Sequence, residues 1–215
     1  MNHRQTLVQA LPALGLALDD AQVTALLDYL ALIQKWNRVY NLTAVRDPQE
    51  MLTHHLLDSL TAVAPLLRHT GGRPAKVLDV GSGGGLPGIV LAICRPELEV
   101  RCVDTVGKKA AFIQQVAASL KLPNLQGVHA RVETLAGPFD VICCRAFAAL
   151  PDFVRWSRQA LAPAGVWMAM KGKHPQEELS ALPADMDVFH VEPLTVPGLS
   201  AERCIVWMRL AAQDS

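Results

Sequence analysis

Apolar residues follow two different spacings along the chain, and the change lies near residue 72. Over residues 23–36 and 52–63 they recur every three to four positions, which is the period of amphipathic helices. Asp19, followed three residues later by a glutamine, predicts the start of the first helix. Asp47-Pro48 predicts the start of the second, which we expect to run toward Pro65. A Gly-Gly-Arg-Pro segment then interrupts the pattern.

After this segment, short apolar runs alternate with helical segments. We expect strands at 76–80, 100–103, 125–129, 139–143, 166–170, 188–191 and 203–210, and helices near 87–94, 108–120 and 151–161. Such alternation is typical of a parallel sheet with helices on both faces. The last two strands have little helix between them, which favours an antiparallel hairpin at the sheet edge. The sequence thus predicts an α/β fold, with a helical extension (residues 1–72) packed on a core domain (residues 73–215).

Composition and charge narrow the class of protein. Hydrophobic residues make up 51% of the chain and charged residues 19%, as in a folded globular protein. Twenty Lys and Arg balance twenty Asp and Glu, so no charge block indicates a nucleic-acid or membrane surface. No apolar run approaches the ~18 residues of a membrane span. Residues 4–18 resemble a weak signal peptide, but Gln9 and Pro12 interrupt the apolar run.

The cysteines indicate a reducing compartment. There are five, an odd number, and none forms a C-x-x-C pair of the kind found in zinc or redox sites. Buried free thiols are the expected state. We therefore expect a soluble cytoplasmic protein without a metal site.

The candidate chemistry begins with a glycine-rich turn between the first strand and the helix after it, Gly81-Ser82-Gly83-Gly84-Gly85-Leu86-Pro87-Gly88. Glycines there permit positive φ angles and let the backbone approach a ligand closely. Asp104 follows Gly85 by nineteen residues, at the end of the second strand, where a carboxylate can accept hydrogen bonds from ribose hydroxyls. A tight turn beside a solvated acid is the simpler interpretation, but the combination favours a nucleotide site.

Two nucleotide motifs fit this turn. Gly83-x-Gly85-x-x-Gly88 matches the dinucleotide pattern and keeps an NAD-dependent oxidoreductase as an alternative. Asp79 followed by Gly81-x-Gly83-x-Gly85 resembles the first motif of class I S-adenosylmethionine (SAM)-dependent methyltransferases. Residues 131–133, after the third strand, and 138–142, at the start of the fourth, match the later segments of those enzymes. A non-catalytic nucleotide-sensing or RNA-binding module is a third hypothesis, because no acid–base pair is evident.

Several further segments occur in a fixed order: Trp36–Thr43, Arg46-Asp47-Pro48, His55–Ser59, Arg145–Ala148 and Met170–Gly172. Together with the glycine turn they are similar to the bacterial RsmG (GidB) family of 16S ribosomal RNA guanine-N7 methyltransferases. The resemblance covers about residues 30–208. It implies a class I, Rossmann-like methyltransferase fold with a mostly parallel seven-stranded sheet, SAM as cofactor, and 16S rRNA, free or in the small subunit, as substrate. It also implies no metal, no membrane association and a monomer.

The resemblance also implies which residues form the site. It places cofactor contacts at Gly81, Leu86, Val132, Glu133 and Arg145, with Asp104 as the ribose-binding acid and with Gly83 and Gly85 in the same loop. Guanine N7 has a lone pair and no proton, so the reaction needs positioning and no general base. We expect Arg145 and Lys171 to be the positioning residues.

Arg145 and Lys171 follow the fourth and fifth strands, at the edge where ligands of open α/β sheets bind. A cation there can hold a carboxylate or a phosphate, although a structural ion pair is the simpler role for each. His55 and Asp58 are one helical turn apart and can pair with each other. Either pairing or contact with substrate is compatible with their spacing. Arg203 is a further substrate candidate.

Two asparagines and two aromatic residues lie near the end of the first long helix. Asn37 and Asn41 are candidates for polar contacts to substrate. Trp36 and Tyr40 are expected in the core rather than stacked on a base. Lys108-Lys109, at the start of a later helix, is expected to be a solvated pair near the cofactor.

Overall fold

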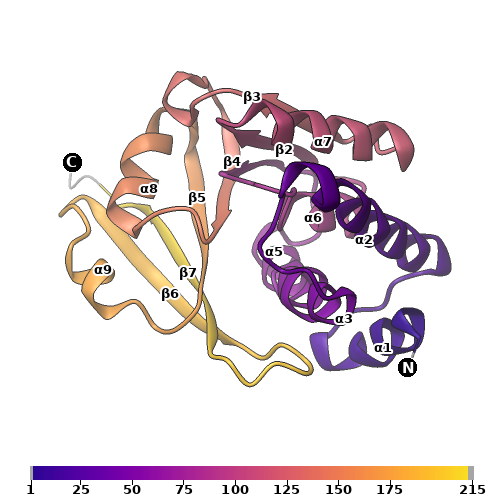
Figure 1. The fold of residues 1–215 in the computed structure, drawn as a ribbon. Coiled ribbons are helices and arrows are strands. Elements are labelled where there is room, and N and C mark those ends of the chain that lie inside the picture. The colour runs from indigo at the N-terminus through magenta and orange to yellow at the C-terminus, as the bar shows by residue number, and fades with distance from the viewer. Residues whose placement is uncertain (1, 213–215) are drawn as a thin grey trace.

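A seven-stranded sheet forms the middle layer of the protein, as the computed structural model of residues 2–212 shows (Figure 1). The strand order is β3-β2-β1-β4-β5-β7-β6. Strands β3 to β5 in this order pair in parallel, and β7 runs antiparallel to both of its neighbours. The bounds are β1 (Lys76–Val80), β2 (Glu99–Asp104), β3 (Leu125–His129), β4 (Phe139–Arg145), β5 (Leu161–Lys171), β6 (Met186–Leu194) and β7 (Arg203–Leu210). The parallel sheet and its antiparallel edge hairpin are confirmed.

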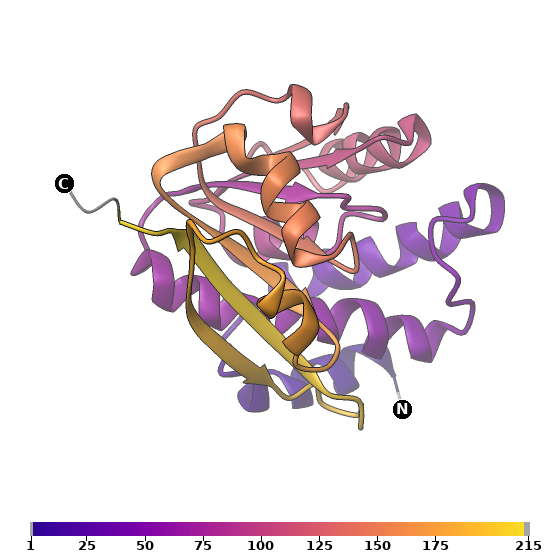
Figure 2. The ribbon, with the colours of Figure 1, turned by 90° about the vertical axis from the view of Figure 1, so that its left-hand side faces the viewer.

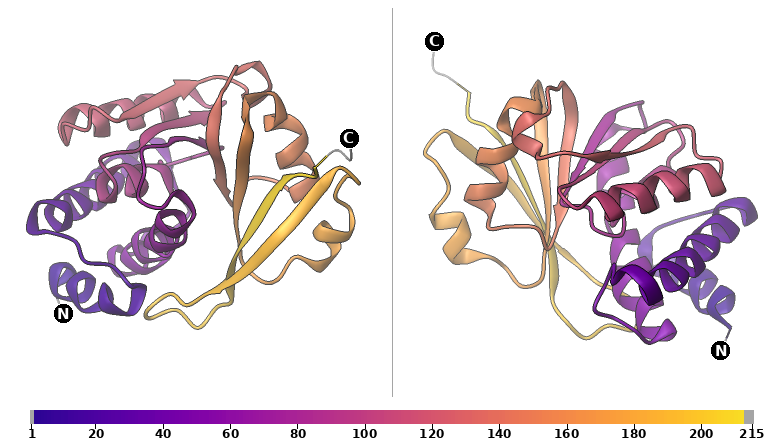
Figure 3. Two further views of the ribbon diagram at one scale, coloured as in Figure 1. Left: turned by 180° about the vertical axis from the view of Figure 1, so that it is seen from behind. Right: turned by 45° about the horizontal axis from the view of Figure 1, so that its top comes forward.

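Helices cover both faces of the sheet (Figures 1 and 3). One face carries α1 (His3–Ala10), α2 (Asp20–Tyr40), α3 (Pro48–Met51), α4 (Asp58–Leu60), α5 (Val63–Thr70), α6 (Gly88–Cys94) and α7 (Gly107–Ser119). The other carries α8 (Leu150–Ser157) and α9 (Gln176–Ser180). Short turns η1 (Pro12–Leu14), η3 (Val132–Thr134) and η4 (Arg158–Ala160) and the π-helical segment η2 (Leu52–Leu57) complete the described elements.

The pleat of the strands divides the core in two. Val77 of β1 and Val141 of β4 belong to the cluster under α2, α6 and α7, whereas Leu78 and Ile142, one position later, belong to the cluster under α8. Successive side chains of a strand point to opposite faces. The strands are therefore apolar on both faces, which explains their continuous apolar runs.

The helical region departs from its predicted form in one place. Asp19 caps α2 through a reciprocal capping box, and Asp47 caps α3, as expected. The following helix is not one piece that ends toward Pro65; η2, α4 and a turn precede α5, which continues to Thr70. Pro65 lies in the first turn of α5, where backbone N–H groups have no intrahelical acceptor, so a proline is tolerated there. Helix α9 was not predicted.

The helical region and the sheet share one core. A single cluster of buried side chains extends from Leu7 to Trp207, and the Gln22 side-chain amide donates to the Ile93 and Cys94 carbonyls at the end of α6. The division at residue 72 into extension and core domain stays a prediction. Figure 2 shows that β6 and β7 form the edge of the sheet nearest the viewer, on the side away from α2.

Two expectations about the whole chain can be compared with the described residues. All five cysteines are buried free thiols. Within residues 2–212, none of the helices has the length and apolar character needed to cross a membrane.

Candidate active site

A buried carboxylate on β1 holds the end of the glycine-rich turn. Asp79 of β1 accepts a hydrogen bond from the Gly88 amide at 2.8 Å, which fixes the start of α6 against the strand. A Cβ at Gly88 would lie 2.3 Å from the Cys102 sulfur, so this glycine permits close helix–strand packing. Burial is the main cause that raises the pKa of Asp79 to about 7. The third glycine of the dinucleotide-like pattern thus has a packing role.

Two further side chains, Asp104 and Tyr29, hold the turn through hydrogen bonds. The Asp104 carboxylate accepts from the Gly83 amide at 3.0 Å and from the Val106 amide at 2.8 Å. The Tyr29 hydroxyl, buried on α2, donates to the Gly84 carbonyl at 2.6 Å. Gly83 has a φ of +57°, and a Cβ built on it meets nothing within 4 Å. The backbone of the turn therefore faces open space at Gly83.

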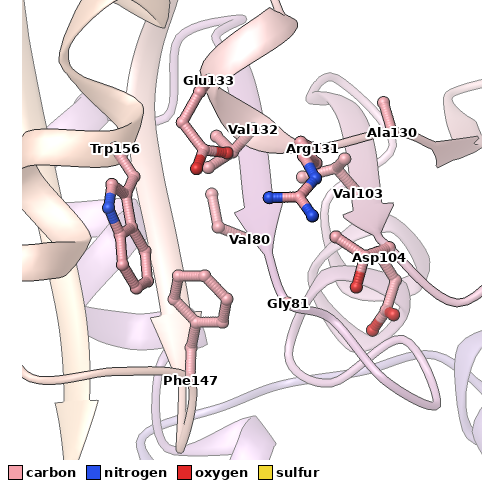
Figure 4. Close-up of a pocket in the computed structure, with 11 residues that line it drawn as sticks. Val80, Gly81, Val103, Asp104, Ala130, Arg131, Val132, Glu133, Phe147 and Trp156 are labelled. Atoms are coloured by element: carbon pink, nitrogen blue, oxygen red, sulfur yellow. The ribbon is translucent and has the colours of Figure 1, made fainter.

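Three cavities lie in a row along the carboxyl edge of the parallel strands. The first extends from the end of β2 to α8 and is shown in Figure 4; its lining residues are Val80, Gly81, Val103, Asp104, Thr105, Ala130, Arg131, Val132, Glu133, Phe147 and Trp156. In this view the Asp104 and Glu133 carboxylates lie at its rim, and the Phe147 and Trp156 rings form one wall. The cavity combines apolar faces with two acceptors.

The second cavity lies over the glycine turn and shares Gly81 with the first. Its lining residues are Ile33, Leu42, Thr43, His55, Gly81, Ser82, Gly83, Gly84, Leu86, Lys109, Arg145 and Ala146. The third shares His55, Arg145 and Ala146 with the second and is also lined by His54, Asp58, Met170, Lys171, Gly172 and Arg203. Because of these shared lining residues, the second cavity lies between the first and the third.

An arginine–aspartate–arginine cluster forms the wall of the third cavity. Asp58 accepts from Arg145 Nη1 at 2.7 Å through one carboxylate oxygen and from Arg203 Nε at 2.8 Å through the other. Only 5% of the Asp58 side chain is exposed. The cluster carries one net positive charge, and its geometry is pre-organised by the shared carboxylate.

The π-helical segment η2 contributes to this cluster. The Asp58 amide donates to the Thr53 and His55 carbonyls and bypasses the carbonyl of His54. Arg145 Nη1 donates to that His54 carbonyl at 2.8 Å. π-Helical turns are frequent at functional sites because they redirect backbone groups in this way.

His55 does not pair with Asp58, which removes one of the two alternatives that their spacing left open. Its Nε2 lies 2.7 Å from the Thr43 hydroxyl, while Asp58 is held by the two arginines. Burial, followed by the positive charge of Arg145, lowers the pKa of His55 to about 4. Its Nδ1 is buried without a hydrogen-bond partner among the described residues. His55 is therefore a neutral imidazole near pH 7.

Lys171 is paired rather than free. Its Nζ donates to Glu178 of α9 at 2.7 Å and to the Ala148 carbonyl at 2.9 Å. It also lines the third cavity, so the same side chain forms a structural ion pair and borders a possible ligand site. Helix α9, which the sequence pattern did not predict, supplies the carboxylate.

The two asparagines have structural contacts. Asn37 is 2% exposed on α2; its amide donates to the Val45 carbonyl and accepts from the Thr43 amide. It lines none of the three cavities, so the prediction of direct substrate contact is not supported for it. Asn41 ends α2 with a φ of +50° and accepts from Arg46. Asparagine tolerates this left-handed conformation.

The two aromatic residues at the end of α2 differ in how far their side chains are buried. Trp36 is half-buried against the core, near its predicted place. Tyr40 is 41% exposed, so its prediction as a core residue is wrong. The end of α2 projects beyond the sheet (Figure 2), where no further layer covers the helix.

The structure brings most of the predicted site residues to this edge. Gly81, Asp104, Val132 and Glu133 line the first cavity; Gly83, Leu86, His55 and Arg145 line the second; Asp58, Lys171 and Arg203 line the third. Gly85 lines none of them, and its φ of +87° makes it a turn residue. The sequence did not single out Trp156 or Thr43. Trp156 lies in no motif, and Thr43 ends the Trp36–Thr43 segment, which does not signal its contact with His55. No His, Cys, Asp and Glu cluster suited to a metal ion is found within residues 2–212.

Known proteins are similar in sequence to this chain over most of its length. A family model described as GidB, rRNA small subunit methyltransferase G, matches residues 22–206. The ribosomal RNA small subunit methyltransferase G of Acidovorax sp. (strain JS42) is 73% identical over 208 residues, which cover 93% of this chain and 92% of that protein.

Two solved structures are similar in fold. Magnesium protoporphyrin IX methyltransferase from Synechocystis PCC 6803 with bound SAM has a TM-score of 0.61 at 16% identity, covering 91% of this chain and 99% of that one. The 1,6-didemethyltoxoflavin-N1-methyltransferase of Burkholderia thailandensis has a TM-score of 0.59 at 19% identity, covering 86% and 90%. The class I methyltransferase fold is thus confirmed. Because the family match runs from α2 into β7, the chain belongs to the GidB family, the rRNA small subunit methyltransferases G.

Proposed function

We propose that this protein transfers a methyl group from SAM to N7 of a guanine in 16S rRNA. The observation that carries the proposal is the row of three adjoining cavities at the carboxyl edge of the sheet, in a chain of the GidB family. Ligands of open α/β sheets bind at this edge. One elongated cofactor and one acceptor base need adjoining spaces of this kind.

The first two cavities suit SAM. Val132 and the Phe147 and Trp156 rings offer apolar faces for an adenine, and Asp104 and Glu133 offer acceptors for hydroxyl groups. The open backbone at Gly83 permits close approach of the amino-acid part of the cofactor. We also place Gly81, Leu86 and Arg145 in this site. When bound, SAM supplies an electrophilic methyl group.

The third cavity suits the acceptor nucleotide. Its walls carry Arg145, Arg203 and Lys171, which can position phosphate oxygens of RNA. Guanine N7 attacks with its own lone pair, so these residues orient the base and no side chain removes a proton. A neutral His55 agrees with this role, because a group that stays neutral near pH 7 does not repel the positive charge that the methylated base gains.

Neither alternative function is favoured. The packing of Gly88 against Cys102 is also what the last glycine of a dinucleotide turn provides, so it does not discriminate, whereas the match to the GidB family over residues 22–206 disfavours an oxidoreductase. The absence of an acid–base pair, which favoured a non-catalytic module, is what an N7 acceptor requires. We expect a monomer that works in the cytoplasm, on free RNA or on the small subunit.

Transfer of tritiated methyl groups from SAM to ribosomal RNA of cells that lack this gene tests the proposal. Borohydride–aniline cleavage of the product identifies N7. We expect label in 16S rRNA and cleavage at one guanine. Labelled RNA that resists cleavage would show that the methyl group is on an atom other than N7.

Thermal shift with S-adenosylhomocysteine (SAH) and with NADH tests the cofactor separately. A ligand at ~100 times its dissociation constant adds about 2.7 kcal/mol of stability. We expect this with SAH and not with NADH. Stabilisation by NADH alone would overturn the methyltransferase assignment.

A further inference from the structure

The charges of this neutral chain are unevenly placed. Segments 29–46 and 105–132 together hold seven of the twenty Lys and Arg residues and none of the twenty Asp and Glu residues. They form the second half of α2 with its following loop, and α7 with β3. Helices α2 and α7 pack against each other, with the Trp36 and Phe112 rings 5.3 Å apart. The two acid-free segments therefore lie side by side.

Exposed apolar side chains gather where these segments meet. Among the described residues five large apolar side chains are exposed, and three of them are Val39 (70%), Tyr40 (41%) and Val106 (43%). Lys108 Nζ lies 5.5 Å from the centre of the Tyr40 ring. Trp36, half-buried, supports the same ring at 5.0 Å. The exposed Tyr40 ring, with the tryptophan and the lysine beside it, forms a platform.

This platform borders the proposed active site. Lys109, next to Lys108, lines the second cavity, and its Nζ lies 3.9 Å from the Asp104 carboxylate. Leu42 and Thr43, shortly after Tyr40, line the same cavity. A chain that crosses the platform therefore reaches the cavity that adjoins the methyl-acceptor site.

We propose that Val39, Tyr40, Val106, Lys108 and Lys109 form a docking patch for an unpaired segment of the RNA substrate. A base stacks on the Tyr40 ring beside the two valines, and Lys108, with Lys109 nearer the cavity, binds the phosphate backbone. The proposal rests on the proposed function and names where its substrate binds.

The chemistry of the patch favours RNA over a protein. Proteins recognise single-stranded RNA by stacking unpaired bases on aromatic side chains and by holding phosphates with cations. Lysine is depleted from the cores of protein–protein interfaces. The two segments that carry the patch also hold basic and no acidic residues, although the total charge of the chain is zero. A basic surface is the electrostatic footprint of nucleic-acid binding.

The test measures binding to small ribosomal subunits and to free 16S rRNA in the presence of SAH, together with methyl-transfer kinetics. Stacking on an aromatic ring is worth about 1–3 kcal/mol per base, so Tyr40→Ala is expected to weaken RNA binding by roughly tenfold. Tyr40→Phe keeps the ring and is expected to bind within about twofold of wild type. Lys108→Ala is expected to reduce the slope of log K against log salt by roughly 0.7–0.9. In both alanine variants KM for RNA rises, while kcat and SAH affinity hold.

Phe189 and Arg209 provide a matched control on the β6–β7 hairpin. Phe189 is 37% exposed, and the Arg209 guanidinium lies 5.0 Å from its ring centre, but Arg209 is paired with Asp187. Phe189→Ala and Arg209→Ala are expected to leave RNA binding and its salt slope unchanged. Circular dichroism checks that every variant is folded.

Three results would overturn the docking patch. They are RNA binding by Tyr40→Ala within twofold of wild type, an unchanged salt slope in Lys108→Ala, and equal losses in the hairpin controls. An unchanged salt slope with weaker binding to subunits would indicate a ribosomal protein as the partner instead. Because binding is measured without methyl transfer, failure of the proposed reaction leaves this test intact.

Discussion

At the scale of single residues, the Asp104 carboxylate combines two tasks. It accepts hydrogen bonds from the Gly83 and Val106 amides, and it lies at the rim of the first cavity. Asp104→Asn removes the charge that strengthens both these bonds and the bonds proposed to ribose. A charge-assisted hydrogen bond is worth about 1.5–3 kcal/mol, so SAH affinity is expected to fall about tenfold or more. Calorimetric titration measures this, and an unchanged affinity would reject Asp104 as the ribose-binding acid.

A substitution at Gly83 tests whether the glycine turn leaves space for the cofactor, and a control at a second glycine accounts for the backbone strain. Gly83→Ala forces a side chain into the left-handed region, which costs about 1–2 kcal/mol, and places its Cβ in the open second cavity. Gly15 has a φ of +67° and also meets nothing within 4 Å, so Gly15→Ala is the matched control. Both variants are expected to lose similar stability in urea unfolding, and only Gly83→Ala to lose SAH binding. Normal SAH binding by Gly83→Ala would show that the turn does not cradle the cofactor.

The protonation state of His55 makes a prediction about mechanism. Burial and Arg145 lower its pKa to about 4, so it is neutral at every pH from 6.5 to 9. The single-turnover rate at saturating SAM and RNA is expected to show no His55 ionisation in this range. His55→Asn is expected to lower the rate through lost positioning and to leave the shape of the pH profile unchanged.

A limb of the profile near pH 7 would belong to a different group. The pKa of Asp79 is raised by burial to about 7, so such a limb should persist in His55→Asn and vanish in Asp79→Asn. An acidic limb that disappears in His55→Asn would instead identify His55 as a base and contradict the N7 mechanism.

At the scale of elements, helix α2 contacts the glycine turn of the proposed active site through the hydroxyl group of one tyrosine. Tyr29 is fully buried and donates to the Gly84 carbonyl at 2.6 Å, so it connects the helical region to the glycine turn. Tyr29→Phe leaves that carbonyl without this partner, and an unsatisfied buried group costs about 1–3 kcal/mol.

Tyr29→Phe should therefore unfold at lower urea concentration and bind SAH more weakly than wild type, because the turn loses one of its fixed points. Equilibrium unfolding with and without SAH separates the two effects. A loss of stability that is identical with and without SAH would show that the hydroxyl supports the fold alone.

At the scale of the whole molecule, the shared core predicts cooperative unfolding. The main cluster of buried side chains joins α1 and α2 to the strands without a break. Helices α2 and α6 are also joined through the Gln22 amide. We expect one urea transition in which tryptophan fluorescence and far-ultraviolet circular dichroism coincide. Two separate transitions would instead support independent folding of residues 1–72 and 73–215.

The local chemistry of the sequence determined much of this protein. The period of its apolar residues predicted strands β1 and β3 at their observed bounds, and capping residues predicted where α2 and α3 begin. The glycine turn and Asp104 indicated a nucleotide site at one edge of the sheet. These features depend on residues close together in the chain, where backbone conformation and short-range hydrogen bonds dominate.

Only the tertiary structure decided which distant residues meet. Asp58 pairs with Arg145 and Arg203, 87 and 145 positions away, and not with His55 on its own helix. Glu178, from an unpredicted helix, pairs with Lys171. Tyr40 is exposed although we expected its aromatic ring in the core. Ion pairs and burial depend on the crossing of strands and on which helix covers which face, and neither is encoded in the spacing of residues along one segment.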